Sequence, residues 1–93
     1  MEIKQEDGAS KGTFFIEQEG ERVAFMTYSK APNLIIIDHT EVSEVLKGKN
    51  AGKQLVAAAV AYARKNNLKI LPLCPFARSV FDRVKEYADV RKV

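Results

Sequence analysis

A cysteine followed by a proline is the feature of this sequence with the most direct chemistry. Proline is favoured at the first position of a helix, so the pair Cys74-Pro75 predicts a thiol at a helix N-terminus. The partial positive charge of that terminus stabilises a thiolate and lowers the pKa of the cysteine. Cys74 is therefore a candidate reactive group. A cysteine packed in the core as a small hydrophobe is the alternative interpretation.

A second candidate site is a loop that carries lysines among small residues. It consists of Lys47, Gly48, Lys49, Asn50, Ala51, Gly52 and Lys53, and a segment with helical periodicity follows it. Small residues let the backbone approach a ligand, and the amides at the start of a helix favour phosphate. We expect a pyrophosphate to bind here. Taken alone, a loop of this composition is also typical of a plain connection.

The only histidine in the sequence is the third candidate. His39 lies two residues from Ile37 and two from Glu41, so in a regular strand these three side chains share one face. An imidazole on that face could serve as a proton acceptor. A hydrogen-bonded structural histidine is the alternative interpretation.

Hydrophobic periodicity predicts the elements that position these groups. In the first part of the chain, residues 2–6, 13–18 and 22–28 are typical of strands, and residues 19–21 of a tight turn. These segments predict an antiparallel meander. A β-branched run over 34–42 follows, and its apolar start predicts a central strand that is buried on both faces.

The second part of the chain predicts a strand–loop–helix–strand unit. Apolar residues at three- and four-residue spacing indicate a helix over 51–66, and residues 69–73 a short buried strand. A short helix over 75–83 and a loosely held tail over 85–93, with Tyr87 docked, complete the chain. A crossover helix joins parallel strands and places ligands at their carboxyl ends. We therefore expect an α+β fold in one domain, residues 1–93, with the loop and Cys74 close together.

Composition excludes several classes of protein. The apolar run at 34–37 is far shorter than the ~20 residues of a membrane span, and the charged start of the chain is unlike a secretory signal, so we expect a cytoplasmic protein. One cysteine and one histidine leave no recognisable metal site. The net charge of +3 is spread among acidic residues without an aromatic-basic stripe, so nucleic acid is not the expected partner.

The loop and the segment 73–76 resemble the GCN5-related N-acetyltransferase (GNAT) superfamily, in particular its short YjdJ-type domains. The family signature is Gln or Arg, two residues, Gly, one residue, then Gly or Ala, before a helix. Gly52 matches the last position of that signature, whereas Lys47 and Asn50 depart from it. Asn50 can still adopt a positive φ. The resemblance covers residues 13–87 and includes the run from His39 to Val42.

The resemblance implies acetyl-CoA as cosubstrate and transfer of its acetyl group to an amine. Its pantetheine would pair with the backbone near residues 41–45 and its pyrophosphate would bind at residues 47–53. The implied cofactor-binding set is Glu41, Val42, Lys47, Gly48, Lys49, Asn50, Ala51, Gly52, Lys53, Cys74 and Phe76. The implied catalytic candidates are Cys74, as an acyl acceptor or a residue that lines the thioester pocket, and His39 or Glu41 as general base.

The acceptor is not identified by the sequence. By resemblance, ordinary members of the superfamily wall the acceptor pocket with helices, for which residues 7–12 are too few. An open acceptor side fits an exposed amine on a protein or a polyamine. A CoA- or acyl-CoA-binding module with slow or no catalysis, and a thiol-transfer protein that uses Cys74, are the alternative functions.

Overall fold

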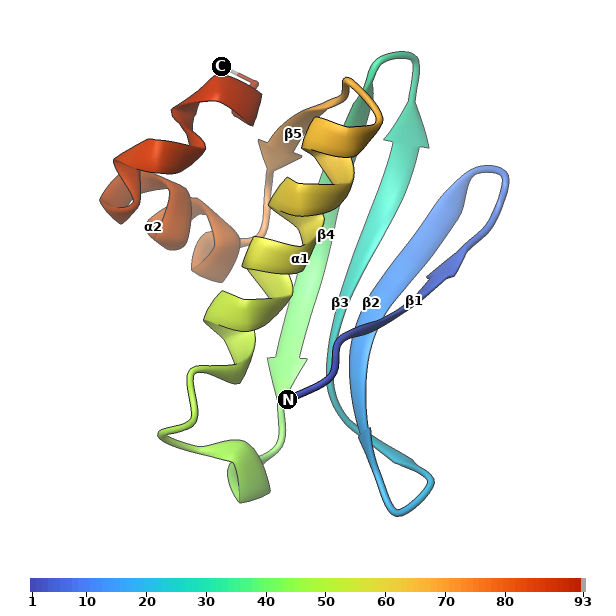
Figure 1. Ribbon diagram of the computed structural model, residues 1–93, viewed down its shortest axis with the longest axis vertical. Helices are drawn as coiled ribbons and strands as arrows, with labels where there is room; N and C mark the ends of the chain where they lie inside the picture. Colours follow the sequence, from blue (N-terminus) through green and yellow to red (C-terminus); the bar gives the residue numbers. More distant parts are fainter. Residues whose placement is uncertain (93) are drawn as a thin grey trace.

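A five-stranded sheet forms the frame of the computed structural model, which describes residues 1–92 (Figure 1). The strands follow one another in chain order across the sheet. Neighbours are antiparallel except for β4 and β5, which are parallel. The strands are β1 (Lys4–Asp7), β2 (Lys11–Gln18), β3 (Glu21–Ala31), β4 (Leu34–Val42) and β5 (Lys69–Pro72). The predicted α+β class is confirmed.

Helices cover one face of this sheet. The main helix α1 (Ala51–Lys65) lies across it, and α2 (Pro75–Arg83) packs beside α1 at the β5 side (Figure 1). Two 3₁₀ helices, η1 (Glu44–Leu46) and η2 (Lys85–Val90), complete the fold, and η1 was not predicted. The core between helices and sheet is built from alternate strand residues and the apolar stripe of α1, among them Met26, Tyr28, Ile35, Ile37, Leu55 and Val56. Within residues 1–92, no helix covers the opposite face of the sheet, which we call the bare face.

The predicted turns are confirmed by the backbone. Glu19 and Gly20 both have positive φ, 52° and 81°, which matches the two-residue hairpin turns that fit the twist of antiparallel strands. At the end of α1, Asn67 adopts the left-handed conformation with φ of 55°. Asparagine tolerates this conformation better than most residues, so the predicted helix end at 66–67 is close to the observed one.

Strand β4 corrects two predictions. Ile35 and Ile37 are fully buried beneath α1, but Leu34 and Ile36 are only half-buried, because the bare face has no covering layer. The pairing with β3 also shifts its register, from Thr27–His39 to Tyr28–Ile37, so Asp38 is an extra residue. Such a bulge breaks the alternation of side chains. Ile37 points into the core, whereas His39 is exposed and does not share its face.

The C-terminal segment is docked rather than loosely held. Val90 is buried in the core, and the amide of Lys92 donates to the carbonyl of Ile70 on β5 (2.8 Å). The guanidinium of Arg64 binds both carboxylate oxygens of Asp89. Tyr87 packs on Phe81, as predicted, with ring centroids 5.7 Å apart. Scattered polar contacts of this kind leave little periodicity in the sequence. Val93 lies outside the described residues.

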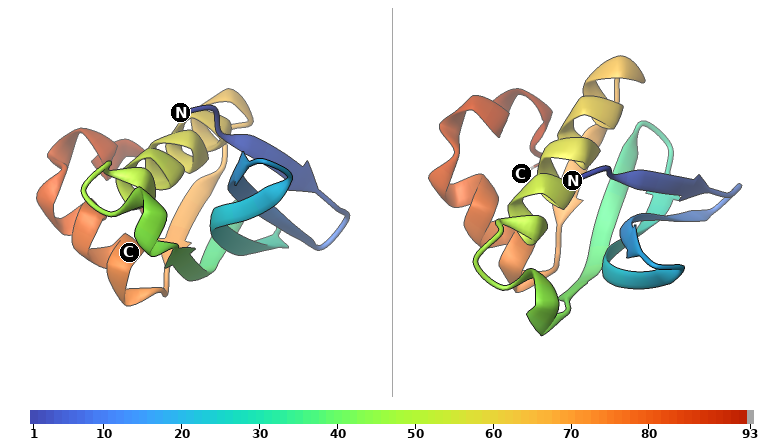
Figure 2. Two further views of the ribbon diagram at one scale, coloured as in Figure 1. Left: turned by 90° about the horizontal axis from the view of Figure 1, so that it is seen from below. Right: turned by 60° about the horizontal axis from the view of Figure 1, so that its bottom comes forward.

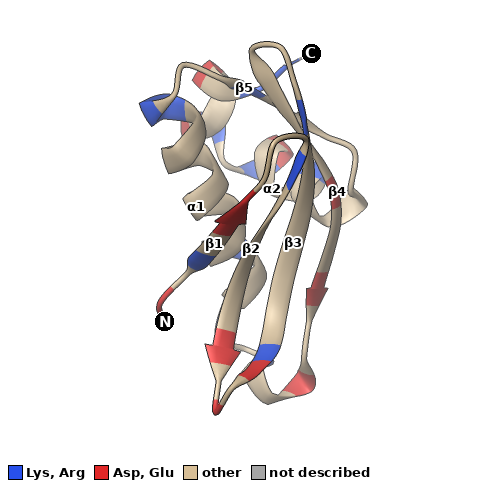
Figure 3. Cartoon of the chain, turned by 90° about the vertical axis from the view of Figure 1, so that its right-hand side faces the viewer, with Lys and Arg blue, Asp and Glu red and all other residues tan. Residues whose placement is uncertain are grey.

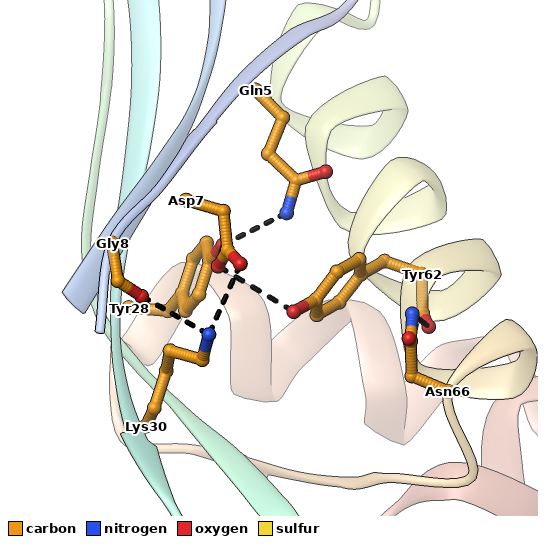
Figure 4. Close-up of polar contacts among 7 residues, drawn as sticks. All are labelled: Gln5, Asp7, Gly8, Tyr28, Lys30, Tyr62 and Asn66. Atoms are coloured by element: carbon orange, nitrogen blue, oxygen red, sulfur yellow. Dashed lines mark hydrogen bonds and ion pairs between the residues drawn. The ribbon is translucent and has the colours of Figure 1, made fainter. Parts of the chain in front are cut away.

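A polar cluster fastens the edge strand β1 to the rest of the fold (Figure 4). The Asp7 carboxylate accepts hydrogen bonds from the hydroxyls of Tyr28 (2.5 Å) and Tyr62 (3.4 Å) and from Lys30 Nζ (3.0 Å). Gln5 donates to the same Tyr28 hydroxyl (2.8 Å). The hydrogen bond from Tyr28, followed by the contact with Lys30, holds the pKa of Asp7 below its ordinary value, although partial burial opposes the shift.

We expect Asp7→Ala to lower the free energy of unfolding by about 1–3 kcal/mol at pH 7, because it removes the acceptor of the buried Tyr28 hydroxyl. A carboxyl with a lowered folded-state pKa stabilises the protein above its unfolded pKa, near 3.8, and this contribution is lost as the pH falls through the folded value. The deficit of the variant should therefore shrink below about pH 4. Urea denaturation from pH 2 to 7 measures it, with Glu2→Gln as the control that should not differ from the parent protein.

Candidate functional site

The two parallel strands separate halfway along β4. Their pairing ends at Ile37–Pro72, and the carbonyl of Ile37 accepts the amides of Leu73 and Cys74 (both 3.1 Å). Beyond this point the chain turns into α2, while β4 continues to Val42. The last four residues of β4, His39 to Val42, are therefore paired with β3 but not with β5. We call the space beside them the strand gap.

Free backbone groups of β4 face the strand gap. In an antiparallel ladder, residues alternate between those that bond their partner strand and those that point away from it. The amide of Ser43 donates to the carbonyl of Val23 on β3 (2.7 Å). With the observed register, Glu41 also bonds β3, so the N–H and C=O groups of Thr40 and Val42 point towards the strand gap. An extended ligand can pair with this edge.

The lysine loop lies between the end of β4 and the start of α1 (Figure 2). Asn50, the residue before the helix, is left-handed with φ of 58° and makes no side-chain capping hydrogen bond. Gly48 is also left-handed, with φ of 80°. The predicted positive φ of Asn50 is confirmed. Lys47, Lys49 and Lys53 are exposed, so the uncapped first-turn amides and the three charges are available to an anion.

Gly52 is required by a neighbour rather than by its backbone angle. A Cβ atom at this position would lie 2.6 Å from Cζ and 2.7 Å from Cε2 of the Phe76 ring. The ring of Phe76 therefore rests directly on the first turn of α1. This contact brings the start of α2 to the loop, and the predicted meeting of the two segments is confirmed. Ala51, which precedes Gly52, is buried beside it.

Cys74 is the residue before α2, and its thiol is buried at the strand gap. Its Sγ lies 3.5 Å from Thr40 Oγ1 and is in position to donate to it. Burial raises the pKa of the thiol, but hydrogen bonds from the Thr40 hydroxyl and from the amides of Ala77, Phe76 and Thr40 outweigh it, so the net pKa is lowered. The predicted helix terminus supplies two of these amides. The contact with Thr40 was not predicted, because Thr40 and Cys74 are thirty-four residues apart in sequence.

His39 and Glu41 lie together on the bare face. His39 Nε2 is 3.7 Å from Glu41 Oε2, and both side chains are about 60% exposed. The His39 ring also lies beside Phe25, with centroids 6.1 Å apart. Thr40, which lies between His39 and Glu41 in sequence, points to the opposite face of β4. Cys74 therefore contacts Thr40 but lies across the strand from His39 and Glu41. The two groups of catalytic candidates thus lie on opposite sides of β4.

Large exposed apolar side chains surround the strand gap. Val42 is 42% exposed at the end of β4, Val45 61% in η1, Leu73 49% after β5 and Phe76 36% at the start of α2. Val45 and Leu73 were not among the predicted site residues. Their signal in the sequence is an apolar residue next to a predicted strand end, where no core partner is expected. An apolar rim of this kind suits an aliphatic chain.

The structure was also searched for metal-binding clusters and for helices that could cross a membrane. Among residues 1–92, no group of three or more His, Cys, Asp or Glu side chains is arranged to hold a metal ion. Within the same residues, no helix has the length and hydrophobicity that a membrane crossing requires.

The strand gap, the thiol beside it and the lysine loop at the start of α1 lie together in one site, and comparison with known families gives its class. The family model of the GCN5-related N-acetyltransferases matches residues 13–90. The chain therefore belongs to this family. Its members are acyltransferases that use acetyl-CoA, so the predicted enzyme class and cosubstrate are confirmed.

The fold is also similar to solved structures of N-acetyltransferases. The solution structure of a GCN5-like protein from Staphylococcus aureus is 42% identical, with a TM-score of 0.75, and the alignment covers 98% of this chain and 87% of that one. The Escherichia coli ribosomal-protein-S18-alanine N-acetyltransferase shares the fold at 14% identity, with a TM-score of 0.68, over 82% of this chain and 52% of its own.

A third structure, of the aminoglycoside N-acetyltransferase AAC(6')-Iy in complex with CoA, shares the fold at 11% identity. Its TM-score is 0.64, and the alignment covers 87% of each chain. A search of curated protein sequences gave no match.

Proposed function

We propose that this protein transfers the acetyl group of acetyl-CoA to an exposed amine, with the thioester placed in the strand gap. The observation that carries the proposal is the separation of β4 from β5 after Ile37–Pro72. It frees the backbone of Thr40 and Val42 to pair with the amides of pantetheine. The uncapped start of α1, with Lys47, Lys49 and Lys53, supports a pyrophosphate site at one end of the same path.

The proposed acetyl-CoA-binding residues are those that the resemblance to the acetyltransferase family implied. The position of each residue in the structure suggests which part of the cofactor it contacts. The Val42 backbone pairs with pantetheine, and the amides of Gly48 and of Asn50 to Lys53 bind phosphate, whereas the Lys49 amide donates to the carbonyl of Leu46. The ring of Phe76 supports the first turn of α1 at Gly52. Val45 and Leu73 join this set as apolar contacts.

In the proposed reaction, the Cys74 thiolate attacks the thioester carbonyl, and CoA leaves as a thiolate. The acceptor amine then attacks the acyl-cysteine carbonyl, an amide forms, and the Cys74 thiolate is released. The amine loses one proton in this step, and His39 or Glu41 takes it through water, because both lie across β4 from Cys74. The hydrogen bonds from Thr40 and the α2 amides support Cys74 as the nucleophile, because they favour its thiolate.

The two alternative functions have different structural requirements. Thiol transfer to a protein requires an accessible sulfur, whereas Cys74 is 5% exposed. A binding module without catalysis requires only the strand gap and the lysine loop, and a search for turnover with amines distinguishes it from the enzyme. We propose the cytoplasm as the place of action, where a lone cysteine stays reduced.

Calorimetric titration with acetyl-CoA and with CoA tests the binding site. We expect Val42→Pro to weaken binding of both about tenfold, because proline removes an N–H that faces the strand gap and not the β3 ladder. Val42→Ala is the matched control: it keeps this N–H and should retain most of the affinity. The proposal fails if the intact protein binds neither compound, and the backbone assignment fails if the two variants behave alike.

A further inference from the structure

The thiol of Cys74 lies where the proposed site would place the sulfur of CoA. Its Sγ is 3.5 Å from Thr40 Oγ1, and the free N–H and C=O groups of Thr40 and Val42 face the same strand gap. Pantetheine paired with these groups would run along β4 and end beside Sγ. After acyl transfer, the sulfur of CoA and that of Cys74 are therefore left side by side.

Burial restricts which molecules can reach this sulfur. Cys74 is 5% exposed and belongs to the same buried cluster as Ala77 and Val80 of α2. A peroxide is small enough to enter such a site, whereas a thiol or disulfide on the surface of another protein is not. CoA reaches the sulfur along the strand gap, because its thiol stands at the end of a narrow pantetheine arm.

The surroundings of the strand gap favour an uncharged thiol arm over an anionic one. The rim of the gap is apolar, and the exposed carboxylates of Glu41 and Glu44 lie at the end of β4 and in η1. Figure 3 shows further acidic residues on the β2–β3 hairpin, whose second strand pairs with the end of β4. Pantetheine is uncharged, and the phosphates of CoA would bind apart from these carboxylates, at the lysine loop. Glutathione carries a net negative charge and has no such second site.

We propose that Cys74 is a site of reversible modification by CoA, with which it forms a mixed disulfide under oxidising conditions. This rests on the CoA site proposed above and not on catalysis by Cys74. Hydrogen peroxide is the oxidant: the Cys74 thiolate attacks one of its oxygens, hydroxide leaves, and a sulfenic acid forms. The thiolate of bound CoA then attacks the sulfenic sulfur, an S–S bond forms, and a second hydroxide leaves.

The contacts of the thiol support the first step. The thiolate is the reactive form, and although burial raises the pKa of Cys74, hydrogen bonds from Thr40 and from the α2 amides lower it overall. The disulfide would block the thiol and the cosubstrate site together until a thiol reductant releases CoA. Without CoA, the sulfenic acid is oxidised further to sulfinic acid, which thiols do not reduce. Bound CoA would thus protect the protein from irreversible oxidation.

Mass spectrometry of the intact chain after treatment with hydrogen peroxide tests this proposal. With CoA present, the main product should be the chain plus one CoA less two hydrogen atoms, and dithiothreitol should restore the original mass. Glutathione at the same concentration should give at least about tenfold less adduct, because it cannot reach the buried sulfur. Without added thiol, the chain should gain two oxygen atoms, and Cys74→Ala should lose all of these products.

Two variants of Val42 determine whether the adduct forms in the strand gap. At a CoA concentration below saturation, Val42→Pro should reduce the adduct about tenfold, because it removes an N–H that faces the gap. Val42→Ala keeps this N–H and should lose little. Both variants should react with peroxide alone at the rate of the parent protein, which verifies that the thiol is unchanged.

The outcomes separate failure of the modification from failure of the proposed function. If calorimetry detects no binding of CoA, the CoA site is wrong and the mixed disulfide is wrong with it. If CoA binds but peroxide yields only sulfinic acid, or equal adducts with CoA and glutathione, the modification is wrong and the acetyltransferase function is unaffected. An adduct that Val42→Pro and Val42→Ala form equally would also contradict modification within the strand gap.

Discussion

Gly52→Val is expected to weaken acetyl-CoA binding about thirtyfold, because overpacking a filled position typically costs ~2 kcal/mol. The added side chain would meet the Phe76 ring, whose Cζ lies 2.6 Å from the point that a Cβ atom of residue 52 would occupy. The ring must then leave the first turn of α1, and the distance between the lysine loop and the strand gap changes. Isothermal calorimetry measures the affinity, and circular dichroism verifies that α1 remains folded.

A double-mutant cycle identifies the cause of this loss. In a Phe76→Ala background the steric partner is absent, so Gly52→Val should cost little further affinity. If glycine is needed because a phosphate approaches residue 52 itself, the loss should be the same in both backgrounds. The structure favours the first outcome, because the missing Cβ of Gly52 points at the ring.

Cys74→Ala is expected to lower the rate of acetyl transfer at least about a hundredfold while leaving the affinity for acetyl-CoA almost unchanged, because it removes the proposed nucleophile. Rapid mixing with acetyl-CoA in the absence of an amine should load one acetyl group on Cys74, detectable by mass spectrometry of the intact chain. Full transfer activity in Cys74→Ala would show that the amine attacks the thioester directly.

Thr40→Val tests the environment of this thiol without removing it. The variant loses the hydroxyl that stabilises the thiolate, so the pKa of Cys74 should rise. Because the thiolate is the reactive form, the acid limb of the pH–rate profile should move to higher pH, and the rate at neutral pH should fall. A profile that does not move would separate Cys74 ionisation from the reaction. Thr40→Ser, which keeps the hydroxyl, should resemble the parent protein.

Sequence patterns predicted the elements of this fold well where burial is periodic. The helix over 51–66 and the strand over 34–42 differ from the observed α1 and β4 by at most one residue at their ends. Turn residues with positive φ were also predictable, at Gly20 and Asn50, because glycine and asparagine tolerate that conformation. The C-terminal segment was not predictable, because single contacts such as Arg64–Asp89 hold it in place.

The candidate site shows where such reasoning stops. Residue types alone indicated a phosphate-binding loop at 47–53 and a thiol at a helix start, because both depend on local backbone amides. The prediction that His39 and Ile37 share one face of the strand was wrong. One extra residue in β4 reverses the alternation of side chains between the two faces, and the sequence does not reveal such a bulge. The contact between Cys74 and Thr40 joins two elements across the sheet, so periodicity within either element cannot reveal it.

The sequence by itself determined the class of fold, the loop that precedes α1 and the position of the only thiol, since these follow from local propensity and hydrophobic spacing. Tertiary structure decided how these parts combine. It separated β4 from β5 beyond Ile37, seated Phe76 on Gly52, and placed His39 and Cys74 on opposite sides of β4. These features depend on strand register and on the packing of distant side chains, which are set only when the whole chain folds.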